Sequence, residues 1–254
     1  MTQSVYDAYT VYGVRVTALS RHGGASESPY ESLNLAEYVG DDHNAVARNI
    51  EVVTQLAGRE VAVMSAEHGT RIVNVDAPGA CPSGDIAVSH DSSIALLALA
   101  ADCLPIAFMN EHIISTAVVH AGWRGLAAGV LDVALQEFES TGWSLESTAA
   151  VIGPSICGTC YEVGPEVIGA IEAIYPNAVL DSSHVDLALA ATAFLSQQGI
   201  AVHAMTGCTF EDESLFSFRR ARGSATGRGG LLVSRVDAIS VGGNPSIPSD
   251  IQHD

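Results

Sequence analysis

The chain has 254 residues, of which 48% are hydrophobic, and its formal net charge is −18 at pH 7. This excess of acidic residues argues against non-specific binding to nucleic acid or to an acidic membrane surface. All eleven basic residues are arginines, so the chain has neither a Schiff-base lysine nor a P-loop lysine. Any phosphate or carboxylate group of a ligand would therefore meet arginine, a backbone N–H or a metal ion.

We expect one domain spanning 1–254, because no linker-like stretch interrupts the chain. The longest wholly apolar run, from Ile94 to Ala101, is far shorter than the roughly 20 residues of a membrane-spanning helix. The first residues lack the basic flank and apolar stretch of a signal peptide, and five cysteines are an odd number for a disulfide framework. These features predict a cytoplasmic protein, a monomer or homodimer, with a flexible tail from about 242.

The first third of the chain alternates strand-like and helix-like patterns. A strand is expected over 11–19, followed by a loop over 20–35 that is dense in Gly, Ser and Pro. Asp41 or Asp42 would cap a helix over 43–57, which has apolar residues at helical spacing. Two short strands, 61–65 and 71–75, would then flank His68.

The rest of the chain continues this alternation. Apolar runs of strand length cover 94–101, 105–109 and 113–119, and a helix is expected over 125–139. A strand over 149–153, helices over 164–175 and 186–198, and a last core strand over 201–205 follow, before an Arg-rich segment over 216–230. Interleaved strands and helices predict an α/β fold in which a mixed sheet is flanked by helices.

Three residues that can bind a metal lie in three separate segments. They are His68 in AEHGTRIVNVD (66–76), Cys103 in ADCLPIAF (101–108) and His120 in VVHAGWRGLAAGV (118–130). Each alone is compatible with a structural role, and an isolated Cys103 would most often be a buried, inert thiol. Asp102 and Arg124 lie beside them, and such charges need partners or ligands when buried. Three protein ligands and an open fourth position are typical of a catalytic zinc site.

These segments, together with IGPSICGTCYEVGPEV, SRHGGASESPYESLNLAEYVGDD and FSFRRARGSATGR, resemble the polyphenol oxidoreductase/laccase-like family, which is now associated with purine nucleoside phosphorylase activity. The similarity covers roughly residues 12–235. It implies a cysteine-hydrolase-like layered fold, and a metal held by His68, Cys103 and His120. That metal would be Zn²⁺, with Cu²⁺ as the alternative ion.

The resemblance also implies the substrates, which would be purine nucleosides (adenosine, inosine and methylthioadenosine) and phosphate. A catalytic zinc lowers the pKa of its bound water to about 7, which would serve the hydrolytic deamination of adenosine. Phosphorolysis needs a grip on the phosphate dianion, for which the planar fork of arginine is suited. The candidates are Arg21, Arg124, Arg219, Arg220 and, less strongly, Arg228. Asn34 is a candidate contact to the ribose or base. Asp102 is a candidate to orient a metal ligand or, less strongly, to act as an acid or base.

Two features depart from the family pattern. Ala66 and Glu67 stand before His68, where the family usually has Gln followed by an apolar residue, and Glu67 would alter the charge of the site or point to solvent. The segment after GPSI reads Cys157-Gly-Thr-Cys160, where the family often has adjacent cysteines. A CxxC pair is typical of a zinc or redox site, but a single pair leaves a structural zinc short of ligands.

Three rival functions are considered, and the first of them uses residues of the same set. A metal-free hydrolase that edits peptidoglycan precursors would use Cys103 as nucleophile and His120 as base. A copper-dependent laccase is disfavoured, because multicopper sites need many clustered histidines and the nine here include no His-x-His pair. A non-catalytic protein that binds a metal or a partner is the third.

Overall fold

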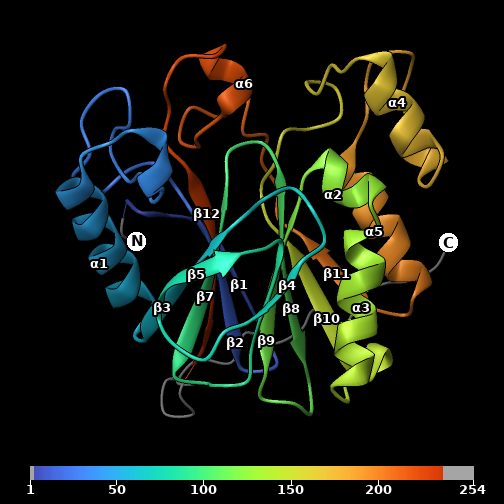
Figure 1. Ribbon diagram of the computed structural model, residues 1–254, viewed down its shortest axis with the longest axis horizontal. Coiled ribbons are helices and arrows are strands. Elements are labelled where there is room, and N and C mark those ends of the chain that lie inside the picture. The colour runs from blue at the N-terminus through green and yellow to red at the C-terminus, as the bar shows by residue number, and fades with distance from the viewer. Residues whose placement is uncertain (1–2, 237–254) are drawn as a thin grey trace, which may run out of the picture.

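The computed structural model describes residues 3–236, which form four layers. Two six-stranded mixed sheets face each other, α1 covers the outer face of one, and α3 and α5 cover the outer face of the other (Figure 1). The α/β fold with mixed sheets flanked by helices is confirmed, with two sheets in place of one. The expected tail from 242 lies outside the described residues.

The first sheet has the order β1-β2-β12-β7-β3-β5. Its strands are β1 (Val5–Val11), β2 (Val14–Leu19), β12 (Gly229–Arg235), β7 (Ile94–Ala100), β3 (Glu60–Ser65) and β5 (Gly79–Ser83). Successive side chains of a strand point to opposite faces. Leu96 in β7 therefore packs between the two sheets, while its neighbour Leu97 packs beneath α1.

The second sheet has the order β11-β10-β8-β9-β6-β4. Its strands are β11 (Ala201–Ala204), β10 (Thr148–Ile152), β8 (Leu104–Asn110), β9 (Thr116–Ala121), β6 (Ile86–Ser89) and β4 (Ile72–Asn74). In β8, Phe108 contributes to the cluster beneath the helices and Met109 to the layer between the sheets. Both faces of this sheet are thus buried, which explains why its strands are apolar throughout.

The helices follow the sequence prediction closely where their caps are clear. They are α1 (His43–Ala57), α2 (Trp123–Ala127), α3 (Val130–Ser140), α4 (Pro165–Glu172), α5 (Leu187–Gln197) and α6 (Phe218–Ala221). Asp42 caps α1, because its side chain accepts a hydrogen bond from the N–H of Ala45 at 2.8 Å. Such a cap contributes about 1 kcal/mol to helix stability.

The structure corrects four element predictions. The strand expected over 11–19 is divided by a hairpin turn, since Tyr12 and Gly13 both have positive φ and form the two-residue turn that suits strand twist. The helix expected over 125–139 is broken at Gly129, whose φ is +81°. The segment 201–205 is an edge strand with exposed ends, whereas the last core strand is β12 between β2 and β7. Strands β1, β5 and β6 were also missed.

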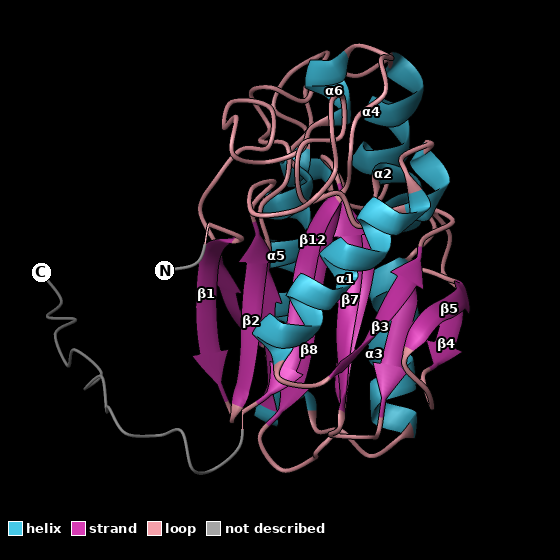
Figure 2. Cartoon of the chain, turned by 90° about the vertical axis from the view of Figure 1, so that its left-hand side faces the viewer, coloured by secondary structure: helices cyan, strands magenta, loops and turns pink. Residues whose placement is uncertain are grey.

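The chain passes from the first sheet to the second after β3, β5 and β7. These three strands are parallel, so the three connections leave from one end of the sandwich. Irregular loops and the short helices α2 and α6 gather at the same end (Figure 2). Among the described residues, no helix has the length and apolar character needed to cross a membrane.

Candidate metal centre

The three predicted ligands, His68, Cys103 and His120, meet in space. His68 lies in the β3–β4 connection, Cys103 immediately before β8, and His120 near the end of β9. Their ligand atoms all lie within 4.8 Å of one another, and the His68 Nε2 is 3.9 Å from the Cys103 Sγ. His120 is buried, Cys103 is half-buried and His68 is exposed, so one side of the cluster faces solvent.

Asp85 holds two of these ligands in position. Its carboxylate is fully buried and lies 2.9 Å from the Nδ1 of His120. It also accepts hydrogen bonds from the backbone N–H groups of His68 at 2.9 Å and Gly69 at 2.7 Å, with a longer one from Glu67. Because Nδ1 is engaged by Asp85, the Nε2 of His120 is the atom free to bind a metal. A carboxylate behind a histidine ligand is the usual way to fix its ring and tautomer.

The charges within the cluster support one another. Burial alone would raise the pKa of Cys103, but hydrogen bonds with His120 and His68 outweigh it and lower that pKa to about 6. Burial alone would lower the pKa of His120, but hydrogen bonds with Asp85 and Cys103 outweigh it and raise that pKa to about 9. The metal-free cluster at neutral pH therefore contains a thiolate beside an imidazolium. A thiolate is the form of cysteine that binds metals or attacks carbonyl groups.

Gly122 closes one side of the cluster at very short range. A Cβ atom at this position would lie 3.1 Å from both the Cys103 Sγ and the His68 Cδ2. The residue precedes α2 and has an extended backbone, with φ of −74°. A glycine is therefore needed here for the chain to pass the ligands without displacing them.

Two residues of the cluster region have strained backbones. His68 has φ of +63° and Asp102 has φ of +97°, a region that side chains other than glycine rarely adopt. Three N–H groups bonded to Asp85 fix the turn at His68. Strain of this kind persists where surrounding contacts determine the conformation, and it concentrates at functional sites.

Asp102 contacts neighbouring loops and not the metal ligands. Its carboxylate accepts hydrogen bonds of 2.6 Å from the hydroxyl of Thr209 and from the backbone N–H of Arg219. Its own carbonyl accepts a bond from the N–H of Ile156. The carboxylate that touches a ligand side chain is thus Asp85, and the orienting role predicted for Asp102 stays a prediction.

Arg124 and Arg219 lie near Tyr161, and the charge of Cys103 also reaches this ring. Burial raises the pKa of Tyr161 to about 12, the nearby Cys103 adds to this rise, and the two arginines oppose it. The guanidinium of Arg219 lies 5.2 Å from the centre of the Tyr161 ring, and that of Arg124 lies 4.3 Å from the Trp123 ring. Both predicted phosphate contacts therefore come close to the cluster.

Tyr38, in the short turn Glu37–Val39, lies near the charges of Cys103 and of Arg228, which directly precedes β12. Desolvation raises the pKa of Tyr38, a hydrogen bond to Arg228 opposes this rise, and the charge of Cys103 adds to it. Tyr38 is 63% exposed and lines an apolar cavity of about 370 Å³. The other cavity-lining residues include Leu35, Ile50, Met64, Ser65 and Leu99.

Arg21 and Arg220 lie together elsewhere. They line a cavity of about 540 Å³ that also contains Glu31 and Glu213, and none of its lining residues belongs to the metal cluster. Arg220 donates to the carbonyls of Thr209, Phe210, Asp212 and Leu215, so it shapes the loop before α6. The roles predicted for these two arginines as phosphate contacts stay predictions.

Asn34 is fully buried and ties two segments together. Its amide group donates to the carbonyl of Ala36 and to Asp41, and its oxygen accepts from the N–H groups of Ala36 and Arg228. Both amide hydrogens and both lone pairs are thereby used. A direct contact with ribose or base would require one of these bonds to break.

Sequence reasoning missed Asp85 and Tyr38. The signal for Asp85 was a charged residue directly before the mostly apolar segment Ile86–Ser89. Such a position indicates a buried carboxylate, which needs hydrogen-bond partners. Nothing in the sequence around Tyr38 distinguishes it from an ordinary surface aromatic residue.

Comparisons with known proteins assign the chain to a family. The model of a family described as multi-copper polyphenol oxidoreductase laccase matches residues 15–235. The chain belongs to this family. A protein of Streptomyces coelicolor named purine nucleoside phosphorylase is 35% identical over 230 residues, which cover 86% of this chain and 94% of the relative. A protein of Pseudomonas aeruginosa with the same name is also 35% identical, covering 87% and 93%.

A solved structure from the same family extends the likeness to the fold. The Neisseria meningitidis protein NMB0706 superposes with a TM-score of 0.80 at 32% identity, covering 91% of this chain and 99% of that one. The resemblance stated from the sequence motifs is thereby confirmed.

The donor set of the cluster fits a single zinc or copper ion. Two imidazole nitrogens and one thiolate match the preference of both ions for nitrogen and sulfur ligands, and zinc sites with three protein ligands leave a position for water or substrate. His68, Cys103 and His120 would hold the ion, and their present spacing requires little movement to do so.

We predict that Asp85→Asn weakens zinc binding by about 10- to 100-fold, because an amide cannot accept bonds from both His120 and the His68 turn as a carboxylate does. Competition with a chromogenic chelator measures the affinity. Asp76→Asn, which removes the same charge from an exposed position, is the matched control. Equal zinc affinity in both variants would contradict the role of Asp85.

We also predict that zinc binding releases about one proton between pH 6 and 9. In this range Cys103 is already a thiolate and His120 is still protonated, so His120 must lose a proton to bind the metal. The apparent affinity should rise with pH across this window and level off above it. Calorimetry in two buffers of different ionisation enthalpy counts the protons, and no release would show that His120 is neutral before the metal binds.

Proposed function

We propose that this chain is a zinc-dependent purine nucleoside phosphorylase that also deaminates adenosine, with adenosine, inosine and methylthioadenosine as its substrates. The observation that carries the proposal is the cluster of His68, Cys103 and His120. Its support from outside the structure is that relatives about one third identical bear the name purine nucleoside phosphorylase.

When bound, the zinc supplies a Lewis acid and lowers the pKa of a coordinated water, which serves hydrolysis at the purine ring. The protein's part is to keep its ligands in place. Asp85 holds the ring of His120 and the turn at His68, while Gly122 leaves room beside them. The exposure of His68 gives a nucleoside access to the cluster from solvent.

Phosphorolysis breaks the bond between the ribose C1′ and the purine N9 and forms a bond from C1′ to a phosphate oxygen. The purine leaves with a proton, and ribose 1-phosphate is the second product. Arg124 and Arg219 suit the phosphate best among the predicted contacts. The charges of both arginines, like that of Cys103, affect the pKa of Tyr161, which supports a position near the cluster. Arg124 is exposed and its guanidinium is stacked on Trp123, so its outer N–H groups face solvent.

The apolar cavity at Tyr38 is the proposed pocket for the purine base. Its volume of about 370 Å³ lies in the usual range for small-molecule sites. Ser65, at the end of β3, lines it three residues before His68. The charge of Cys103 contributes to the raised pKa of Tyr38, which supports a base pocket close to the cluster.

Two rival functions are weaker on these observations. In the described part of the chain, the groups able to hold an ion contain only two histidines, His68 and His120, whereas a multicopper oxidase centre needs many more. A metal-free hydrolase based on Cys103 and His120 gives no role to His68, although its N–H and side chain are both positioned at the cluster. That difference is what the experiment below uses.

The proposal also covers the partners, the oligomeric state and the cellular compartment. The partners are small molecules, nucleosides and phosphate, and the expected oligomeric state is a monomer or homodimer. The cysteines of the described residues are all free, which suits the reducing conditions of the cytoplasm, where we expect the protein to act.

We predict that the zinc-loaded protein releases free base from inosine, adenosine or methylthioadenosine only when phosphate is present, and ammonia from adenosine without phosphate. His68→Ala should abolish zinc binding at the His68–Cys103–His120 cluster and both activities together, since it removes one of three ligands. His112→Ala, an exposed histidine outside the cluster, should leave both unchanged.

Chromatography of the bases and an ammonia assay read out these reactions. If His68→Ala lost the zinc of this cluster and kept its activity, the metal mechanism would be wrong and the Cys103–His120 hydrolase would replace it. If the wild type acted on none of the three nucleosides with or without phosphate, the proposed substrate class would be wrong.

We further predict that Arg124→Gln raises the KM for phosphate about tenfold or more while changing the KM for the nucleoside little, since a charge-assisted bond to phosphate is lost. Arg48→Gln, an exposed arginine on α1, is the control. Initial rates at varied phosphate give the two constants. An unchanged KM for phosphate would remove Arg124 from the phosphate site.

A further inference from the structure

A second group of metal-binding side chains lies outside the cluster described above. The Sγ atoms of Cys157, Cys160 and Cys208 and a carboxylate oxygen of Glu211 all lie within 4.8 Å of one another. The CxxC pair alone lacks enough ligands for a structural zinc site. Cys208 and Glu211, about 50 residues further along the chain, complete a set of four.

The topology of the second sheet explains why these residues meet. β10 and β11 are parallel neighbours, so the loops that follow them leave from the same end of the sheet. Their pairing extends past the strands through a bridge between Ser155 and Cys208, where the N–H of Thr209 donates to the carbonyl of Ser155 at 3.0 Å. Cys157 follows Ser155 by two residues, and its N–H donates to the Sγ of Cys208 at 3.3 Å.

Two turns direct the four side chains toward one point. The N–H groups of Cys160 and Tyr161 both donate to the carbonyl of Cys157, which folds the CxxC segment tightly. The N–H groups of Glu211 and Asp212 both donate to the carbonyl of Cys208, which brings Glu211 back beside that thiol. Each turn therefore supplies two donors, as the two halves of a structural zinc site commonly do.

We propose that Cys157, Cys160, Cys208 and Glu211 form a second, structural zinc site that joins the loop after β10 to the loop after β11. Thiolates favour soft or borderline ions, and four protein ligands leave no open position for a substrate. The proposal concerns the stability of these loops and does not depend on the nucleoside chemistry of the first site.

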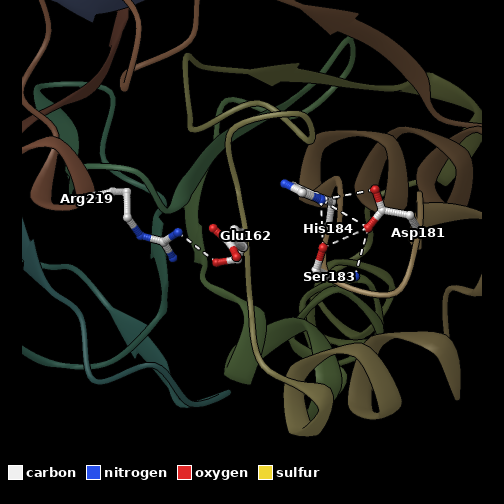
Figure 3. Close-up of polar contacts among 5 residues, drawn as sticks. All are labelled: Glu162, Asp181, Ser183, His184 and Arg219. Atoms are coloured by element: carbon white, nitrogen blue, oxygen red, sulfur yellow. Dashed lines mark hydrogen bonds and ion pairs between the residues drawn. The ribbon is translucent and has the colours of Figure 1, made fainter.

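The two loops that this zinc would join carry residues of the first site. Tyr161 follows Cys160 directly, and Arg219 lies at the start of α6 beyond Glu211. Figure 3 shows the side chain of Arg219 reaching across to Glu162, whose carbonyl accepts its N–H at 2.7 Å. On the far side of Glu162, His184 pairs with Glu162 in a β-bridge, and its ring is hydrogen-bonded to Asp181. A zinc ion that joins the two loops would hold Arg219 at a fixed distance from Glu162.

Metal analysis of the purified protein tests the proposal. We expect about two zinc ions per chain in the wild type and about one in His68→Ala, which retains only the second site. Cys157→Ser/Cys160→Ser should also hold about one, and Cys81→Ser, a half-buried cysteine outside both clusters, should hold two. X-ray absorption at the zinc edge of His68→Ala should show three sulfur ligands at about 2.3 Å.

Two further measurements use protein without changes in the second cluster. Titration of His68→Ala with an organomercurial should release its zinc in proportion to thiol modification. Unfolding the wild type without reductant but with a chelator should expose five reactive thiols. Three reactive thiols would mean that two of the cysteines form a disulfide, and zinc-free His68→Ala would mean that no second site exists. Either result would overturn the proposal, whatever the outcome of the nucleoside assays.

Discussion

The buried carboxylate of Asp85 is the constraint on which the rest of the site depends. It receives the imidazole of His120 and the backbone N–H groups of the turn at His68, and it is entirely shielded from solvent. Leaving a buried carboxylate unpaired would cost several kcal/mol, so these groups must remain together for the chain to fold. One interaction thus couples folding of the β3–β4 connection to the geometry of two metal ligands, and the third ligand, Cys103, enters from the β7–β8 connection.

The two-sheet architecture makes this convergence possible. Chain segments that cross between the sheets lie outside the regular hydrogen-bonding ladders, where backbone groups need side-chain partners. His68 and Cys103 both lie in such crossings, while His120 lies on β9, which is buried on both sides. The cluster therefore combines one ligand held by the core with two held by loops. This division explains its graded exposure, from the buried His120 to the exposed His68.

Much of this could be predicted from the sequence, and the failures have physical causes. Helix α1 follows from its spacing and from Asp42, because a cap is a local interaction. The proposed metal ligands follow from motif resemblance, and the structure brings the three residues together. Asp85 does not, since the partners of its carboxylate come from two distant segments and its burial depends on how both sheets pack. The hairpin at Tyr12 was missed because the turn has a single glycine, and Cys208 because only the pairing of β10 with β11 brings it to the CxxC turn.

Asp102 connects the two clusters and shows why a second ion would matter. It precedes Cys103, its carbonyl accepts the N–H of Ile156, and its carboxylate holds Thr209 and the start of α6. Each of these contacts reaches a loop that carries a cysteine of the second cluster. Leu215 and Phe216 are buried just before α6, whereas Phe218 at the start of α6 is 52% exposed. A zinc ion would add rigidity to these loops, and Asp102 would transmit it to the backbone beside the Cys103 thiolate. The strained φ of Asp102 is consistent with a residue whose conformation is determined by contacts on both sides.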